Sequence, residues 1–147
     1  MEVGETFKPG LLHVTIVTWF VSDLDDDELI KSFKKEFAER KAFRLSLGKI
    51  IKFGRKKNIP ANLIRYSEEI IDLHGQALDW MGRLRGRWAV KNPYMAEDYK
   101  PHIRRRPGTK IKEGDDLEIE YLYLISANRT EDNIRTVAAK VRLNEQN

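Results

Sequence analysis

Residues 11–20 read LLHVTIVTWF, a run that contains no Asp, Glu, Lys or Arg and is rich in β-branched and aromatic side chains. This composition is typical of a β-strand. A Pro-Gly pair precedes the run and an acidic cluster follows it, so we predict a strand from Leu11 to Phe20. Because side chains alternate across a strand, His13, Thr15 and Trp19 lie on one predicted face, and the apolar side chains lie on the other.

Downstream of this strand, the spacing of apolar residues predicts two helices and several more strands. The first helix, capped by Ser22 or Asp23, has acidic residues early and basic residues late, as the helix dipole favours. The predicted elements are a helix at Asp25–Lys41, a strand at Phe43–Phe53 with a bulge at Gly48, a helix at Ser67–Leu84, and strands at Lys100–Arg106, Leu117–Ser126 and Ile134–Leu143. This order predicts a domain of the α/β or α+β class.

The length and composition of the chain are those of one folded domain, which we predict to span residues 1–147. Hydrophobic residues make up 41% of the chain and charged residues 34%, a balance that favours a folded protein over a disordered one. The absence of cysteine excludes thiol nucleophiles, disulfides and cysteine-bound metal centres.

The most apolar segment, Leu11–Val21, is too short and too polar to span a bilayer, and the N-terminus lacks the pattern of a signal peptide. We therefore expect a cytoplasmic protein with no membrane partner and no obligate protein partner.

Two of the three histidines, His13 and His102, occur in short predicted strands in different halves of the chain. On a strand, the residue two positions further on shares the same face. Thr15 therefore accompanies His13, and Arg104 and Arg106 accompany His102.

The segments Leu12-His13-Val14-Thr15-Ile16 and Pro101-His102-Ile103-Arg104 resemble the two His-x-Thr/Ser motifs of the 2H phosphoesterase superfamily. This superfamily includes the LigT-like 2′-5′ RNA ligases and cyclic nucleotide phosphodiesterases. A Leu-His pair in the second predicted helix, Leu73-His74, and a Gly-Asp step at Gly114-Asp115 extend the resemblance over most of the chain.

The resemblance implies an α+β fold with two lobes, in which antiparallel sheets form a concave cleft and the helices pack outside. It also implies acid–base catalysis at phosphorus by His13 and His102, without a metal or other cofactor. Histidine suits this chemistry because its pKa lies near neutrality. The implied substrates are RNA ends or nucleotides with 2′,3′-cyclic or 2′-5′ phosphodiester linkages, and Thr15 is implied to hold phosphate oxygens.

The sequence departs from the superfamily at Arg104, where a Thr or Ser hydroxyl is expected. A guanidinium offers several donors and a permanent charge, so Arg104, with Arg106, is predicted to bind the phosphate in place of the hydroxyl. The two arginines would also disfavour protonation of His102 by like-charge repulsion. We therefore expect His102 to be the base and His13 the acid.

Other candidate residues are weighed against simpler structural roles. His74 lies on the apolar face of the second predicted helix, where a buried histidine with satisfied hydrogen bonds is expected. The sequence has no closely spaced set of carboxylates and histidines, so we predict no metal site. The chain has a net charge of +4 and three basic clusters, Lys52–Lys57, Arg83–Arg87 and Arg104–Lys112. Aromatic residues interleaved with these clusters are candidates for base stacking. These candidates are Trp19, Trp88, Tyr94 and Tyr99.

Two alternatives to the main functional prediction remain open from the sequence. One is a nucleotide- or RNA-binding module without turnover, because the second motif lacks its hydroxyl. The other is a phosphodiesterase that degrades oligonucleotide second messengers.

Overall fold

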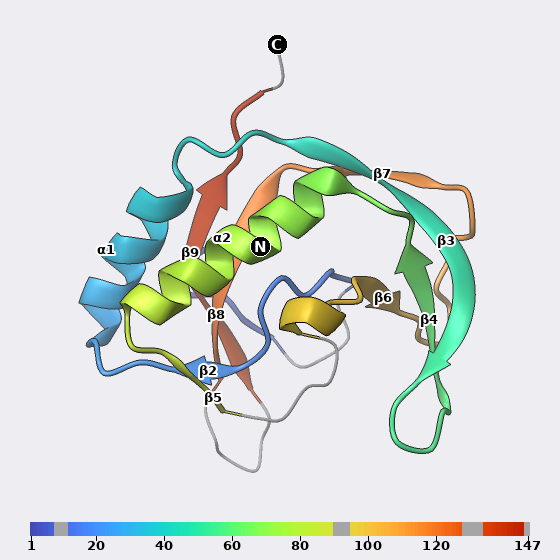
Figure 1. The fold of residues 1–147 in the computed structure, drawn as a ribbon, viewed down its shortest axis with the longest axis horizontal. Helices are drawn as coiled ribbons and strands as arrows, with labels where there is room; N and C mark the ends of the chain where they lie inside the picture. The colour runs from blue at the N-terminus through green and yellow to red at the C-terminus, as the bar shows by residue number, and fades with distance from the viewer. Residues whose placement is uncertain (8–11, 90–94, 128–133, 146–147) are drawn as a thin grey trace. The chain divides into compact units, whose positions relative to one another are not determined.

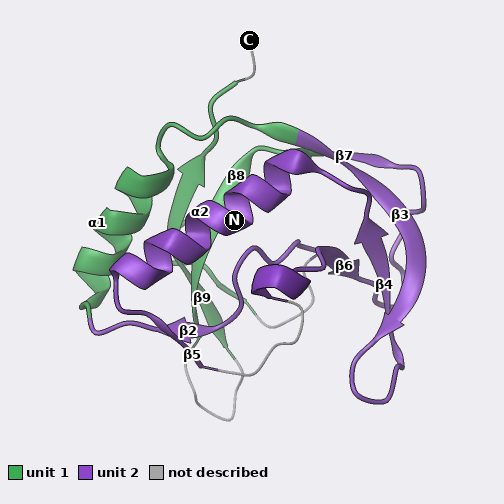
Figure 2. Cartoon of the chain, viewed as in Figure 1, with its two compact units in different colours: residues 1–11, 24–43, 118–147 green, residues 12–23, 44–117 purple. Residues whose placement is uncertain are grey.

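A computed structural model of the protein describes residues 1–7, 12–89, 95–127 and 134–145. The fold contains helices and antiparallel sheets, so the predicted α+β class is confirmed. The chain divides into two compact units, and each is described on its own (Figure 2). Unit 1 comprises Met1–Leu11, Leu24–Phe43 and Glu118–Asn147, and unit 2 comprises Leu12–Asp23 and Arg44–Leu117. That residues 1–147 form one domain stays a prediction.

Unit 1 is a three-stranded antiparallel sheet packed against one helix. The strands are β1 (Thr6–Phe7), β8 (Tyr121–Ala127) and β9 (Arg135–Arg142), in the order β1-β9-β8. Every second residue of β9 is buried, with exposed fractions of 0% at Val137 and Ala139. Helix α1 (Asp26–Phe37) packs against β9 and buries Phe33 and Phe37. This alternation and helical spacing create the core of unit 1.

Helix α1 begins one residue later and ends earlier than predicted. Its N-cap is Asp25, whose Oδ1 accepts a hydrogen bond from the backbone N–H of Glu28 at 2.8 Å. The prediction that Ser22 or Asp23 caps this helix is wrong, because the carboxylate of Asp25 already satisfies the orphan donor of the first turn.

The main sheet of unit 2 has the strand order β6-β4-β3-β7. Its strands are β3 (Phe43–Phe53), β4 (Ile59–Ile64), β6 (His102–Arg104) and β7 (Asp116–Ile119); β3 begins, and β7 ends, in segments of unit 1. Figure 1 shows β3 as a long curved strand that turns back into β4. The register between them shifts between Leu47 and Ile50, which confirms the bulge predicted at Gly48.

Helix α2 (Glu68–Arg83) confirms the second helix prediction almost to the residue. Ser67 is its N-cap, with Oγ accepting a hydrogen bond from the N–H of Ile70 at 3.3 Å. Its buried face consists of Ile70, Leu73, His74, Ala77, Trp80 and Met81. After the helix, Gly86 approaches Met81 so closely that a Cβ would lie 2.5 Å from its Cγ. Only glycine fits at this helix end.

Three shorter elements complete unit 2. Strand β2 (Phe20–Val21) pairs antiparallel with β5 (Arg87–Trp88), and η1 (Ala96–Asp98) is a single 3₁₀ turn before β6. The ring of Phe20 meets that of Trp80 edge-on at 5.9 Å. In the described residues, no helix is long and apolar enough to cross a membrane.

Two strand predictions need correction. Residues 12–19 have no strand, and among the described residues of the predicted strand Leu11–Phe20 only Phe20 belongs to one, β2. The predicted strand Leu117–Ser126 is two strands, because Glu120 separates β7 from β8. The strands predicted around His102 and after Ile134 are confirmed as β6 and β9.

Candidate active site

All the described candidate residues belong to unit 2. They are His13, Thr15, Trp19, Trp88, Tyr99, His102, Arg104 and Arg106. Tyr94, the remaining candidate for base stacking, lies outside the described residues. Trp88 is 41% exposed on β5, and Trp19 is half-buried.

The first motif lies in residues 12–19, which have no regular structure but make specific hydrogen bonds. His74 Nδ1 donates to the carbonyl oxygen of Ile16 at 2.6 Å, and the Tyr99 hydroxyl donates to that of Thr15 at 2.8 Å. Near the end of the segment, the backbone N–H of Ala89 donates to the carbonyl oxygen of Trp19 at 2.9 Å. Residues far away in the sequence therefore hold this segment in place of a strand ladder.

His74 connects this segment to the loop that precedes the second motif. While its Nδ1 donates to Ile16, its Nε2 accepts the N–H of Ala96 at 3.1 Å, so the ring is neutral and both nitrogens have partners. Burial lowers the pKa of His74, and the hydrogen bond to Ile16 opposes this in part. The prediction of a buried, satisfied histidine is confirmed, and the structure adds that it binds two segments of the candidate site.

Tyr99 takes part in the same network. Its ring stacks on that of His74, with centroids 3.8 Å apart and planes 9° from parallel. Burial raises the pKa of its hydroxyl, which stays protonated and donates to Thr15. One face of the Tyr99 ring is thus covered by His74, whereas Trp88 presents an exposed ring.

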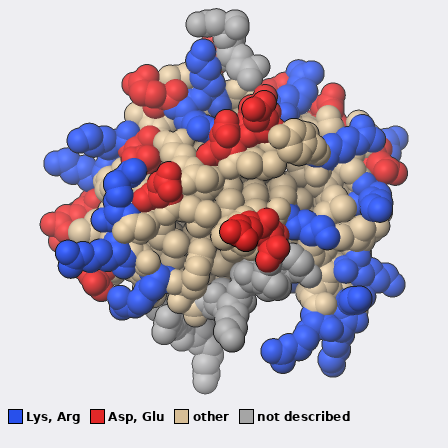
Figure 3. All heavy atoms as spheres, viewed as in Figure 1, with Lys and Arg blue, Asp and Glu red and all other residues tan. Residues whose placement is uncertain are grey.

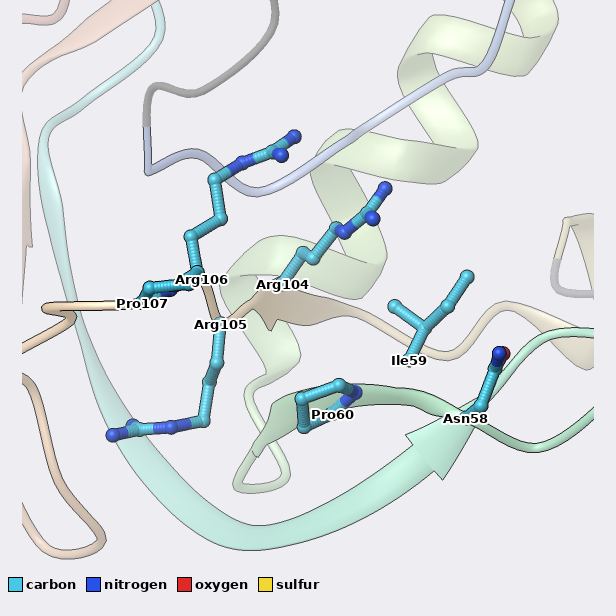
Figure 4. A pocket seen from close by; sticks show the side chains of 7 residues that line it. All are labelled: Asn58, Ile59, Pro60, Arg104, Arg105, Arg106 and Pro107. Carbon is cyan, nitrogen blue, oxygen red and sulfur yellow. The ribbon is translucent and has the colours of Figure 1, made fainter.

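The second motif lies on β6, an antiparallel neighbour of β4. His102 pairs with Leu63 and Arg104 pairs with Ala61. Ile103, between them, is only 3% exposed and points into the core, so His102 and Arg104 share the other face. Figure 4 shows that Arg106 extends to the same side as Arg104. The strand pattern thus places His102 and Arg104 on one face as predicted, and Arg106 lies beyond the end of β6.

The imidazole of His102 is oriented by two neighbours that the sequence did not indicate. Its Nδ1 donates to the carbonyl oxygen of Lys100 at 2.7 Å, which leaves Nε2 as the basic nitrogen. Its ring stacks on Phe53, from the end of β3, with centroids 4.0 Å apart and planes at 20°. An aromatic residue at a strand end is a weak signal, because its contact with His102 depends on how β3, β4 and β6 meet in the sheet.

The pKa of His102 is lowered from that of a free histidine. Burial is the largest cause, and the positive charges of His13 and Lys100 add to it, whereas the hydrogen bond to Lys100 acts in the opposite direction. His13 therefore lies within electrostatic range of His102. The direction of this shift agrees with the expectation for a base. The predicted cause, repulsion by Arg104 and Arg106, is wrong, because the described causes that lower the pKa are burial, His13 and Lys100.

The three consecutive arginines after Ile103 have two different roles. Arg104 is exposed and Arg106 half-buried, and both extend to one side of the chain, whereas Arg105 points to the other (Figure 4). Arg105 donates at 2.6 Å to Asn62 Oδ1 and at 2.6 Å to the carbonyl oxygen of Ile111. Asn62 is fully buried and donates to the carbonyl oxygen of Gly48 at 3.0 Å, so Arg105 stabilises the loop and the bulge.

These arginines border a pocket of about 490 Å³. Its lining consists of Asn58, Ile59, Pro60, Arg104, Arg105, Arg106 and Pro107. Within the described residues, no group of three or more His, Asp or Glu side chains forms a metal cluster. The pocket is thus lined by guanidinium groups and apolar side chains, a combination that suits an organic anion.

Structure comparison places this fold among known ones. The protein TT0787 of Thermus thermophilus matches with a TM-score of 0.63 and 20% identity, over 95% of this chain and 84% of that one. A second solved structure, of a protein described as a phosphoesterase, matches with a TM-score of 0.62 and 14% identity, over 97% and 82% of the two chains. The chain shares its fold with a phosphoesterase. No family model and no curated protein matches the sequence.

Proposed function

We propose that the protein is a two-histidine phosphodiesterase or 2′-5′ RNA ligase-like enzyme. Its substrates would be RNA ends or nucleotides with 2′,3′-cyclic or 2′-5′ linkages. The observation that carries the proposal is that the half-buried His102, with its Nδ1 bonded to the carbonyl of Lys100, shares one face of β6 with Arg104 beside an arginine-lined pocket. His13 lies in the same unit and contributes to the lowered pKa of His102. The fold shared with a phosphoesterase and the resemblance of both motifs to the 2H superfamily support it.

In this mechanism the two imidazoles move one proton each. Nε2 of His102 removes a proton from water, whose oxygen attacks the phosphorus of a 2′,3′-cyclic phosphate. The bond from phosphorus to one ribose oxygen breaks, and protonated His13 gives its proton to that oxygen. The lowered pKa of His102 keeps it in the base form at neutral pH, and no metal is needed because the imidazoles supply both steps. Ligation is the reverse reaction, with an RNA hydroxyl as the nucleophile.

Thr15 and Arg104 would bind the non-bridging phosphate oxygens. Arg104 lies on the face of β6 that carries His102, and its guanidinium provides charged donors where negative charge develops. Thr15 follows His13 by two residues, and its backbone is held by Tyr99. The two side chains would thus approach the phosphate from the two motif segments.

The test is to incubate the protein, in the presence of EDTA, with RNA that ends in a 2′,3′-cyclic phosphate. Parallel reactions would use 2′-5′ oligoadenylate and cyclic dinucleotides, to include oligonucleotide second messengers. We expect turnover of at least one substrate, and a loss of about 10² to 10⁴-fold in kcat for both His13→Ala and His102→Ala. Folding of each variant is checked by circular dichroism. Undiminished turnover in either variant would overturn the assignment of the site.

Binding without turnover is the second candidate function. It is favoured by one observation, that the exposed Arg104 stands where a hydroxyl is expected. In this case the same substrates bind to the wild-type protein and none is converted, and the Arg104→Thr variant is then tested for a gain of turnover.

A further inference from the structure

Basic and acidic residues are unevenly distributed along unit 2. Residues 44–67 contain seven Lys or Arg and no Asp or Glu, and residues 99–112 contain six Lys or Arg and no Asp or Glu. All 23 acidic residues of the chain lie outside these two segments. Such segregation exceeds what a mixed, solvated surface requires, since such surfaces usually intersperse both signs.

The two acid-free segments are neighbours in the sheet. Strand β4, in the first segment, pairs with β6, in the second, through Ala61 and Arg104. Both segments line the pocket beside the arginines, the first with Ile59 and Pro60 and the second with Arg104 and Arg106. Figure 3 shows Lys and Arg side chains gathered at the lower right, where the turn between β3 and β4 lies in Figure 1. Residues that follow the basic turn therefore line the same pocket as Arg104 and Arg106 within unit 2.

The turn between β3 and β4 presents its cations in a defined backbone conformation. Arg55, Lys56 and Lys57 are exposed, as is Lys52 just before the turn. Gly54 and Lys57 both have positive φ, and the N–H of Lys57 donates to the carbonyl oxygen of Gly54 at 3.0 Å. The basic surface thus consists of this turn, residues 52–57, together with Arg104 and Arg106.

We propose that this basic surface binds the sugar–phosphate backbone of a single-stranded RNA chain whose reactive phosphodiester lies at His13 and His102. Two residues along an extended chain span about 6.6 Å, so Arg104 and Arg106 suit successive phosphates of one strand. Arg104 would hold the reacting phosphate, and Arg106 and the turn would hold phosphates further along. The inference rests on the proposed function and narrows its substrate to oligonucleotides over cyclic mononucleotides.

The kinetic test compares two substrates that share the same reacting group. One is a ten-nucleotide RNA with a 2′,3′-cyclic phosphate end, and the other is a 2′,3′-cyclic mononucleotide. The test variant is Arg55→Gln/Lys56→Gln/Lys57→Asn, in which Asn suits the left-handed backbone at position 57. A matched control, Lys31→Gln/Lys34→Gln/Lys35→Gln, removes three charges from α1 of unit 1.

In the wild-type protein, kcat/KM is expected to be at least about tenfold higher for the RNA, through a lower KM, because the extra phosphates release counterions on binding. The turn variant is expected to lose most of this advantage and to keep its kcat/KM for the mononucleotide within about twofold. The control variant should keep the advantage. Equal kcat/KM for the two substrates in the wild type, or equal losses in the two variants, would overturn the proposal.

A binding measurement separates this inference from the proposed function. Fluorescence anisotropy with the same ten-nucleotide RNA, ending in a plain hydroxyl, needs no turnover. The logarithm of the association constant should fall with the logarithm of salt concentration, and the turn variant should show a shallower slope than the control variant by about two, since each phosphate on a single strand contributes about 0.7. Identical slopes in the two variants, or tighter binding to phosphatidylserine vesicles than to RNA, would contradict an RNA surface even if the enzyme turned over.

Discussion

The two histidine motifs are held in place in different ways. His102 lies on β6, whose residues pair one after another with Leu63, Asn62 and Ala61 of β4. His13 lies in residues 12–19, where the described bonds come from the side chains of His74 and Tyr99 and from the backbone of Ala89. A strand ladder distributes its stability over many backbone hydrogen bonds, whereas two of the three described bonds of residues 12–19 each depend on a single side chain. The first motif is therefore the more fragile half of the site.

The largest effect is expected from removing the side chain that holds the first motif. In His74→Leu, a residue of similar bulk loses both ring nitrogens and leaves the carbonyl of Ile16 and the N–H of Ala96 without these partners. We expect the free energy of unfolding to fall by about 2 to 4 kcal/mol, as for two unmade buried bonds. We also expect kcat to fall more than about tenfold, because a misplaced acid–base group costs about 10²-fold.

His74→Asn provides the matched control, because its amide nitrogen replaces Nδ1 and can donate to Ile16 again. We expect this variant to recover part of kcat, with urea unfolding and steady-state kinetics measured on both variants. If His74→Leu kept the wild-type kcat and lost only stability, His74 would have no role in positioning the first motif.

The next largest effect is expected at the second motif, when the hydrogen bonds of Arg105 are removed and the backbone pairing of β6 with β4 is kept. Arg105→Met removes the bonds to Asn62 and Ile111 and leaves the buried Asn62 Oδ1 without that donor. Stability is expected to fall by about 1 to 3 kcal/mol. Because β6 keeps its backbone pairing with β4, kcat should change less than in His74→Leu. Lys110→Met, at an exposed position in the same loop, serves as the control, and a larger kcat loss in Arg105→Met than in His74→Leu would reverse the comparison.

The same difference explains which parts of the fold the sequence predicts. Helix α2 and strand β9 follow from apolar spacing alone, since their buried faces repeat at 3.6 and 2 residues. Residues 12–19 carry the alternation of a strand, but their described partners include the side chains of His74 and Tyr99. A local pattern cannot show that a strand lacks its ladder.

Strand β4 was not predicted, and its second residue, Pro60, explains why. Proline lacks an N–H and usually argues against an inner strand. Here it stands at the strand start, where its carbonyl accepts the N–H of Arg105 at 2.9 Å. Strand alternation correctly predicts that Arg104 and Arg106 lie on one side. The stacking of Phe53 on His102 and the bond of Arg105 to the buried Asn62 have no local signal in the sequence, because both depend on how distant strands meet.

A smaller effect concerns the pH dependence of stability. The pKa values of His74 and His102 lie below 6.5 in the folded protein, chiefly because burial disfavours the charged ring. As the pH falls, the unfolded chain therefore takes up these protons before the folded protein does. The contribution of the two histidines to the free energy of unfolding is fully present above about pH 6.5 and is lost as the pH falls from there toward the folded pKa values. Urea unfolding at a series of pH values should show this decline. His74→Asn should decline less, and an equal decline in both proteins would place the acid sensitivity elsewhere.

The smallest effect separates two charges near the second motif. Lys100→Met keeps the backbone carbonyl that accepts from His102 Nδ1 but removes a charge that lowers the pKa of His102. The pKa of His102 should rise, so the acid limb of the pH profile of kcat/KM should move to higher pH, because the proposed mechanism needs His102 deprotonated as the base. Arg104→Thr is expected to lower kcat/KM through lost phosphate binding while leaving this limb nearly in place, since burial, His13 and Lys100 are the described causes of the shift. If the acid limb moved in Arg104→Thr and not in Lys100→Met, Arg104 would be the residue that lowers the pKa of His102. The second motif would then depend more on the charge that faces the substrate than on its strand.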